Sequence, residues 1–252
     1  MIHFVGAGSG APDLITLRGM RLLEQADVII YAGSLVNPAL LDYAKVGCEI
    51  HNSAEMTLDQ VLAVMEQAES QGKTTVRLHT GDPSVYGAIR EQMDWLDQLG
   101  FHYEVCPGVS SFCGAAAALK AEYTLPNVSQ SVIITRMAGR TPVREEESIR
   151  SFAAHGATMV IFLSAGMTEG LQRELLAGGY TPETPAAIVY KATWPDQKVV
   201  RCTVGTLHQA AQESGIRNLA LITVGGFLGD DYQLSKLYDP TFTTAFRKGT
   251  DQ

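Results

Sequence analysis

Short runs of β-branched and other apolar residues alternate with stretches of helical periodicity along almost the whole chain. In the first half "IHFV", "VIIY" and "TVRLH" have the composition of strands, and amphipathic segments separate them. Two parallel strands need a long crossover, which is usually a helix. This alternation therefore predicts an α/β fold that contains parallel sheet.

The same rhythm restarts after residue 130. The stretch 120–130 contains Pro126-Asn127 and has no strong periodicity, which indicates a linker. We therefore expect two α/β domains, residues 1–120 and 121–252, with a docked or frayed tail from Gly229. The expected strands are 2–5, 28–31, 75–79, 102–106, 131–136, 158–164, 186–190, 198–204 and 219–226. The expected helices are 17–26, 58–70, 88–100, 110–119, 146–155, 169–179 and 206–213.

Charge and cysteine content disfavour several classes of partner. The formal net charge is −8, so the chain lacks the basic surface typical of nucleic-acid binders. The cysteines lie far apart, without C-x-x-C, and no histidine has metal-ligand spacing. We expect reduced thiols, no metal site and a cytoplasmic location. No apolar run approaches membrane-spanning length, so we expect no membrane partner.

The first strand runs into a glycine-rich loop, "GAGSGA" at residues 6–11. It satisfies the relaxed G-x-G-x-x-[GA] fingerprint of dinucleotide enzymes. That fingerprint needs a helix directly after the loop, whereas the expected helix begins only at Thr16. It also needs an acid at the end of the second strand, where this chain has Tyr31. We therefore interpret the glycines as a tight turn that another surface approaches closely.

Two further loops follow strand ends. Gly81-Asp82-Pro83 has a structural interpretation, in which Asp82 caps a helix and Pro83 occupies its first turn. It also has a functional one, because this turn presents backbone groups and a carboxylate at the carboxyl end of a strand. Pro107-Gly108 makes a turn before a small-residue helix that Ser110 or Ser111 caps.

The segment 135–148 carries three arginines, Arg136, Arg140 and Arg144. It is either a solvated loop or a patch that binds carboxylates, because guanidinium groups suit carboxylates. The histidines are scattered singly, and no serine has the G-x-S-x-G elbow of hydrolases. We therefore find no catalytic dyad in the sequence, and it assigns no catalytic residue.

Four segments taken in order carry a specific resemblance: "GAGSGAPDLITLRG", "ADVIIYAGSLV", "GDPSVYGA" and "PGVSSF". Together they resemble the tetrapyrrole (corrin/porphyrin) methylases, from residue 2 to about 228. The resemblance implies two α/β domains with a ligand cleft between them, S-adenosylmethionine as methyl donor, and a homodimer. Many members have Pro where this chain has Ser9, so the contacts of the first loop differ.

Carried onto matching positions, the resemblance implies two sets of site residues. The methyl donor contacts Thr80, Gly81, Asp82, Pro83, Val85, Ser110, Ser111, Leu163, Ala187, Tyr190 and Ala192, with Thr223 or Val224 as further contacts. The tetrapyrrole contacts Ser9, Arg18, Tyr31, Ser34, Tyr86, Arg136, Met137, Arg140 and Lys191.

Within the family, "YAGSLVNP" and "TRMAGRTPV" most resemble members that methylate carbon 11 of precorrin-4 or its cobalt form in cobalamin biosynthesis. The resemblance thus implies a C-methyltransferase. Three alternatives stay open: another acceptor such as uroporphyrinogen III, another precorrin, a modified histidine or RNA; a nicotinamide-dependent reductase; and a non-catalytic binding module.

Overall fold

The computed structural model describes residues 1–250, and the chain divides into two compact units. The first unit comprises Met1–Ala117 and Lys191–Gln197. The second comprises Ala118–Tyr190 and the chain from Lys198 onward. The boundary lies three residues before the expected one at 120, and the sequence did not indicate that 191–197 belongs with the first unit.

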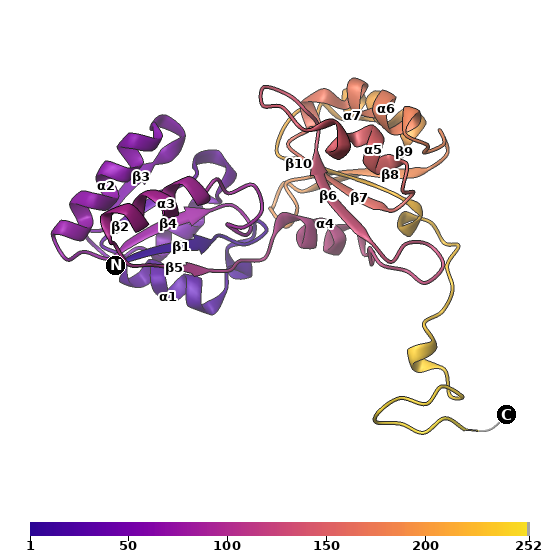
Figure 1. Cartoon of the computed structure of the whole chain (residues 1–252), viewed down its shortest axis with the longest axis horizontal. Helices are drawn as coiled ribbons and strands as arrows, with labels where there is room; N and C mark the ends of the chain where they lie inside the picture. Colours follow the sequence, from indigo (N-terminus) through magenta and orange to yellow (C-terminus); the bar gives the residue numbers. More distant parts are fainter. Residues whose placement is uncertain (251–252) are drawn as a thin grey trace. The chain divides into compact units, whose positions relative to one another are not determined.

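The first unit is built on a five-stranded sheet in which every pairing is parallel (Figure 1). Its strands are β1 (Ile2–Gly6), β2 (Val28–Tyr31), β3 (Glu49–Asn52), β4 (Thr75–His79) and β5 (Tyr103–Cys106), in the order β3-β2-β4-β1-β5. The strand β3 was not expected, because its sequence "EIHN" has only one apolar residue, Ile50, and lies at the sheet edge.

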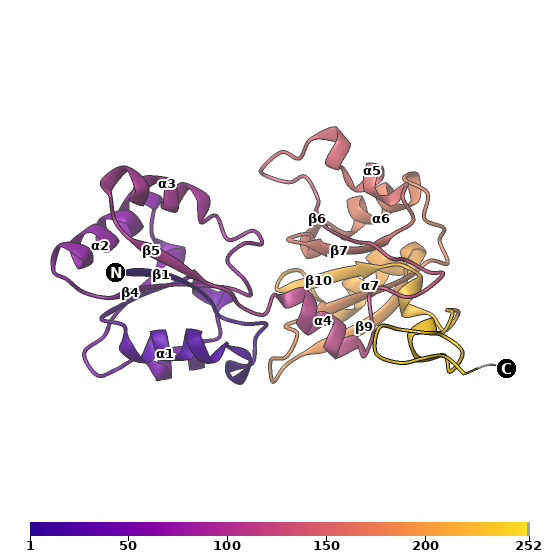
Figure 2. The ribbon, with the colours of Figure 1, turned by 60° about the horizontal axis from the view of Figure 1, so that its bottom comes forward.

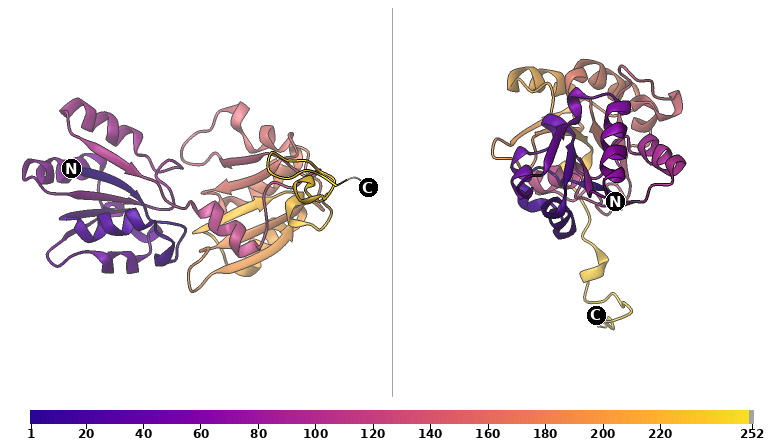
Figure 3. Two further views of the ribbon diagram at one scale, coloured as in Figure 1. Left: turned by 90° about the horizontal axis from the view of Figure 1, so that it is seen from below. Right: turned by 90° about the vertical axis from the view of Figure 1, so that its left-hand side faces the viewer.

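Helices cover both faces of this sheet (Figures 2 and 3). The helix α1 (Leu17–Gln25) packs on one face through Leu23. The helices α2 (Leu58–Ser70) and α3 (Arg90–Leu99) pack on the other through Met65 and Leu96. Local sequence defines the helix ends, since Thr16 caps α1 as predicted and Gly100 ends α3 with φ 70°.

The neighbouring strands β1 and β4 send the chain to opposite faces of the sheet. The chain after β1 leads to α1, and the chain after β4 leads to α3 on the other face. In open parallel sheets, ligands bind at the carboxyl ends of strands that diverge in this way. The glycine loop follows β1 and the Gly81-Asp82-Pro83 turn follows β4, so both occupy this position.

The second unit has a mixed sheet. The alternation of strand-like and helix-like segments after residue 130 had suggested a second parallel sheet. Only β6 and β7 are parallel neighbours. Because β8 and β9 have no helix between them, they pair antiparallel. The strands are β6 (Val132–Arg136), β7 (Thr158–Phe162), β8 (Pro185–Tyr190), β9 (Lys198–Thr203) and β10 (Ala220–Val224), in the order β6-β7-β10-β8-β9. The helices are α5 (Ile149–Ala153), α6 (Thr168–Ala177) and α7 (Leu207–Ser214), and α4 (Ser111–Leu119) crosses the unit boundary.

The expected linker is packed into the second unit. The hydroxyl of Thr158 donates to the carbonyl of Tyr123 at 2.9 Å, and the Thr158 amide donates to Ser129 Oγ at 3.0 Å. Beyond Gly229 the chain extends away from the second sheet (Figure 1) and folds back on itself where Arg247 donates to three backbone carbonyls. No helix within residues 1–250 combines the length and apolarity needed to cross a bilayer.

Candidate functional site

Three loops meet backbone to backbone at the carboxyl ends of β1, β4 and β5. A Cβ on Gly108 would lie 2.1 Å from the carbonyl oxygen of Gly81, and a Cβ on Gly6 would lie 2.6 Å from Gly108 Cα. Gly8 and Gly81 exchange two backbone hydrogen bonds of 3.2 and 3.1 Å. Because no side chain fits at Gly6 or Gly108, these glycines serve close approach, as predicted for the first loop.

The third glycine of the first loop accommodates the segment 191–197. A Cβ on Gly10 would lie 2.3 Å from Cδ1 of Trp194 and 2.5 Å from the carbonyl oxygen of Ala192. The Ala11 amide donates to Thr193 Oγ1 at 2.9 Å. This confirms that another surface covers the glycine loop. A 3-10 turn at Pro12–Leu14 separates the loop from α1, so the helix N-terminus does not follow it as in a dinucleotide site.

The interpretation of Asp82 as a helix cap is wrong, because α3 begins only at Arg90. Instead, Asp82 Oδ2 accepts from the Gly108 amide at 2.8 Å, and Oδ1 accepts from the Ser84 amide at 2.8 Å. Burial opposes ionisation, but these hydrogen bonds, with one from the Ser84 hydroxyl, hold the pKa of Asp82 below its usual value. The carboxylate therefore stays ionised and joins the loops of β4 and β5.

A buried hydroxyl at the start of the β4 loop has no protein partner. Thr80 Oγ1 forms no hydrogen bond with any residue of the described chain. Buried side-chain oxygens in folded proteins nearly always have a partner, so the Thr80 hydroxyl is a candidate hydrogen-bonding group for a bound molecule. Ser110 is buried and Ser111 is half-buried at the start of α4, on the loop that contacts Gly81.

Backbone strain concentrates on the predicted site loops. Within residues 1–250, five of the eight non-glycine residues with positive φ lie there: Tyr86, Ala88, Leu163, Lys191 and Thr193. Each costs roughly 1–3 kcal/mol and persists only where surrounding contacts enforce it. Leu163, with φ 53°, also exposes 63% of its surface at the end of β7. Strain and an exposed apolar side chain together make Leu163 a candidate for a ligand contact.

In the second unit, most predicted residues lie at the carboxyl ends of β6, β7 and β8. Arg136 ends β6, Leu163 follows β7 and Tyr190 ends β8, and these three strands run in the same direction. The Met137 amide donates to Ser164 Oγ at 2.9 Å, which joins the ends of β6 and β7. Ala187 lies inside β8 and is fully buried, so the structure does not place it with the residues at the carboxyl ends of these strands.

Two of the four cations predicted to contact the tetrapyrrole, Arg136 and Lys191, already have partners within the protein. The Arg136 guanidinium donates to the carbonyls of Met137, Thr141 and Pro142 at 3.1, 3.3 and 3.0 Å, so it organises its own loop. Lys191 Nζ lies 2.7 Å from Asp196 Oδ2 and 5.0 Å from the ring centroid of Trp194. The side chains most available to a carboxylate are Arg140, exposed on the β6 loop, and Arg18, exposed on α1.

The predicted contacts of the first loops differ in accessibility. Ser9 is only 7% exposed, because it packs against Gly114 of α4, and its hydroxyl lies 3.4 Å from Thr193 Oγ1. It is thus enclosed by protein. Tyr31 is half-buried at the end of β2, Ser34 follows it on the surface, and Tyr86 has 45% of its surface exposed.

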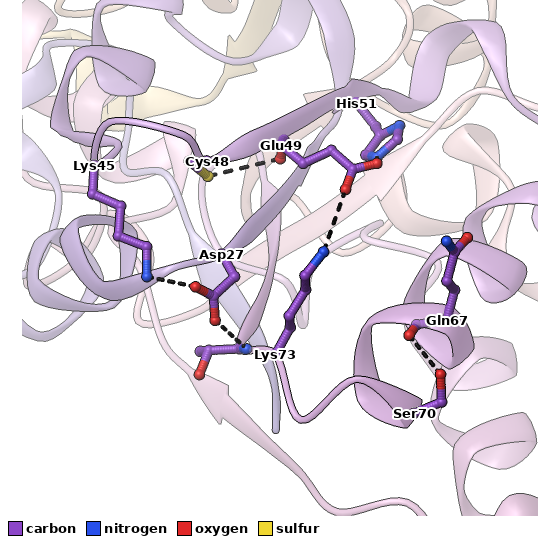
Figure 4. A network of polar contacts seen from close by, with 9 residues as sticks. Asp27, Lys45, Cys48, Glu49, His51, Gln67, Ser70 and Lys73 are labelled. Carbon is purple, nitrogen blue, oxygen red and sulfur yellow. Dashed lines mark hydrogen bonds and ion pairs between the residues drawn. The ribbon is translucent and has the colours of Figure 1, made fainter.

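A network of charged side chains lies at the amino ends of β2, β3 and β4 in the first unit (Figure 4). Asp27, before β2, accepts from Lys45 Nζ at 2.6 Å and from the Thr74 amide at 2.8 Å. Glu49 lies 2.8 Å from His51 and 4.0 Å from Lys73. These contacts join the segments that lead into β2, β3 and β4, so we interpret the network as structural. Across residues 1–250, no three His, Cys, Asp or Glu side chains form a group that could hold a metal ion.

The fold places this chain in the class of two-unit α/β proteins, and its loops form a candidate small-molecule site at the carboxyl ends of the strands of the first unit. The family model for Tetrapyrrole (Corrin/Porphyrin) Methylases matches residues 1–208, and the chain belongs to this family.

Individual relatives share this architecture. The chain is 53% identical over 248 residues to cobalt-precorrin-4 C(11)-methyltransferase of Methanocaldococcus jannaschii, covering 98% of this chain and 96% of the relative. The X-ray structure of a cobalt precorrin-4 methyltransferase matches with a TM-score of 0.89 and 46% identity, over 91% of this chain and 96% of that one. Uroporphyrin-III C-methyl transferase from Thermus thermophilus, complexed with S-adenosylhomocysteine, matches with a TM-score of 0.78 and 26% identity, over 90% and 98%.

Sequence reasoning missed two residues that cover the glycine loop of the candidate site, Thr193 and Trp194. The stretch around them has neither helical nor strand periodicity. In the sequence, only Gly10 pointed to these residues, because a glycine in a tight loop predicts a close neighbour but does not identify it.

Proposed function

We propose that the protein transfers a methyl group from S-adenosylmethionine to carbon 11 of precorrin-4, in its cobalt-containing or cobalt-free form. Family membership and the relative that is 53% identical over nearly the whole chain support this activity. The observation that carries the proposal is the interlocked set of glycine loops at the point where β1 and β4 diverge, with an orphaned hydroxyl at Thr80. The relative from Methanocaldococcus jannaschii and the solved structure with a TM-score of 0.89 are both named for cobalt-precorrin-4. We would therefore assay the cobalt form of the acceptor first.

The loops of the first unit suit S-adenosylmethionine. The donor carries a ribose, an amino group and a carboxylate, all of which need hydrogen-bond partners. Thr80 offers an unused hydroxyl, and the turn after Gly81 offers backbone groups. The proposed contacts in the first unit are Thr80, Gly81, Asp82, Pro83, Val85, Ser110, Ser111 and Ala192. Those in the second unit are Leu163 and Tyr190.

The chemistry requires alignment more than acid or base catalysis. The donor supplies a methyl group on a positively charged sulfur; the carbon–sulfur bond breaks as the bond to the ring carbon forms, and the sulfur keeps the electron pair. The enamine-like ring carbon is already nucleophilic, so no strong base is needed to start the reaction. The rigid loops around Gly81 and Gly108 hold one orientation, and such positioning can supply much of the rate acceleration.

Cations must gather locally to bind an acceptor that carries several acetate and propionate groups. We propose Arg18 and Arg140 as direct contacts, because both are exposed. Arg136 and Lys191 contribute charge while they hold their own loops. Tyr31, Ser34, Tyr86 and Met137 complete the proposed acceptor contacts.

We also propose that the enzyme is a cytoplasmic homodimer. All four cysteines are free thiols, as expected in a reducing compartment. Beyond Gly229, large apolar side chains lie on the surface, which is typical of interaction sites. They are Tyr232, Leu234, Leu237, Tyr238, Phe242 and Phe246. Sedimentation of the full chain tests the dimer, and a monomer at micromolar concentration would contradict it.

Calorimetric titration with S-adenosylhomocysteine, with NADH as a parallel titrant, tests the donor class. We expect one S-adenosylhomocysteine per chain and no NADH binding. The reverse result would mean that the glycine loop holds a dinucleotide and that the proposed function is wrong.

A further inference from the structure

A cation lies buried in the first unit without an acidic partner. Arg77, in the middle of β4, is 7% exposed and points to the face of the sheet that α2 and α3 cover. No carboxylate of the described chain lies within ion-pair distance of its guanidinium. Burial lowers the pKa of Arg77 to about 10, so the group is still charged at neutral pH. A buried unpaired charge is costly, and an apolar side chain would fill this position more favourably.

The hydrogen bonds of Arg77 show what the charge does. Its Nε donates to Gln92 Oε1 of α3 at 3.2 Å, and its Nη1 donates to the Ile30 carbonyl of β2 at 3.2 Å. Gln92 is itself only 4% exposed, and its Nε2 donates to the Ala88 carbonyl at 2.9 Å. Because a guanidinium can only donate, it forces the oxygen of the Gln92 amide to face Arg77. The amide nitrogen must then face Ala88.

Ala88 lies in a loop that needs external support. Within this loop, Tyr86 and Ala88 have φ of 56° and 50°, and a Cβ on Gly87 would lie 2.1 Å from the carbonyl oxygen of Pro83. At its start the loop is held by the Gly8–Gly81 hydrogen bonds and by the contact of Asp82 with the β5 loop. At its end, the bond from Gln92 to Ala88 is the matching attachment.

We propose that Arg77 and Gln92 are positioning residues for the methyl donor. Neither is accessible to a ligand; they act by fixing the far end of the loop 80–89, which carries the proposed donor contacts Thr80–Pro83 and Val85. Arg77 orients the Gln92 amide, and that amide holds the strained backbone at Ala88 in the shape that binds the donor. This inference rests on the proposed function.

The substitution Gln92→Glu separates positioning from stability. A glutamate has the same size and can still accept from Arg77, but as a carboxylate it cannot donate to Ala88. The matched control is Gln212→Glu, which makes the same charge change at an exposed position of α7 in the second unit. Both variants and the unsubstituted protein are titrated with S-adenosylhomocysteine by calorimetry, and their unfolding is followed by tryptophan fluorescence.

We expect the Kd of Gln92→Glu for S-adenosylhomocysteine to rise about fivefold, the value of one lost hydrogen bond, at unchanged stoichiometry. Its unfolding midpoint should be no lower than that of the control, which should bind normally. An unchanged Kd, or a fall in stoichiometry alone, would overturn the inference, because a merely structural role reduces the folded fraction and not the affinity. If the unsubstituted protein does not bind at all, the proposed function fails instead.

Discussion

His79 makes the stability of the first unit depend on pH. Its side chain is 4% exposed at the end of β4, stacks on Phe4 at 6.1 Å between ring centroids, and has an Nε2 without a hydrogen-bond partner in residues 1–250. Burial, helped by the charge of Arg77, lowers the pKa of His79 from 6.5 to about 3. The folded protein therefore keeps this imidazole neutral at any pH above about 3.

The size of the effect follows from proton linkage. As the pH falls below 6.5, the unfolded chain binds a proton at His79 and the folded chain does not, so the free energy of unfolding decreases. Between pH 7.5 and pH 5 the expected loss from this residue is about 2 kcal/mol. The pKa of His3 is also lowered, chiefly by burial, which adds to the loss in the same direction.

The substitution His79→Leu should remove this contribution and leave the unit at least as stable at pH 7.5, because it also deletes an unpartnered buried nitrogen. Both tryptophans, Trp95 and Trp194, belong to the first unit, so their fluorescence during urea unfolding reports on it. The exposed His102→Gln is the control and should keep the full pH dependence. Equal losses of stability between pH 7.5 and 5 in His79→Leu and the unsubstituted protein would refute the reasoning.

Three further predictions concern the site. Gly10→Ala should lower the free energy of unfolding, measured by urea titration, by more than about 2 kcal/mol, because its Cβ would overlap the backbone of Ala192. The control Gly47→Ala has open space around its Cβ and should lower this free energy by only about 1 kcal/mol. Asp82→Asn should weaken S-adenosylhomocysteine binding about tenfold in calorimetry, because an amide cannot accept from two backbone amides with both of its ends; normal binding would contradict this. Arg140→Ala should raise the KM for the tetrapyrrole about tenfold without changing the Kd for S-adenosylhomocysteine. Arg136→Ala should raise this KM as well and should in addition make its loop susceptible to protease. An unchanged KM in both variants would show that these arginines do not contact the acceptor.

Periodicity was sufficient to locate most helices and strands, because each buries one face against a sheet or a helix. It failed at β3, an edge strand of four residues with a single apolar side chain, Ile50, so no apolar alternation marks it. It also failed to distinguish a parallel from a mixed sheet in the second unit. There β10 pairs antiparallel with both β7 and β8, and this pairing depends on contacts between segments far apart in the sequence.

Local chemistry was ambiguous at the site itself. Gly81-Asp82-Pro83 has the residues of a helix cap, but the carboxylate accepts from Gly108, far away in sequence. For Arg136 and Lys191 the sequence gives the charge but not the partner, and the structure gives both side chains partners near their own loops. The positive φ of Leu163 is likewise invisible in a sequence, because tertiary contacts enforce it.

The position of the transferred methyl group tests the central claim most directly. The protein is incubated with S-adenosylmethionine labelled with ¹³C in its methyl group and with cobalt-precorrin-4, precorrin-4 or uroporphyrinogen III, and the products are examined by NMR. We predict a single labelled methyl group on carbon 11 of a precorrin-4 and none on uroporphyrinogen III. Label on another carbon, on uroporphyrinogen III alone, or on no tetrapyrrole would contradict the proposed function.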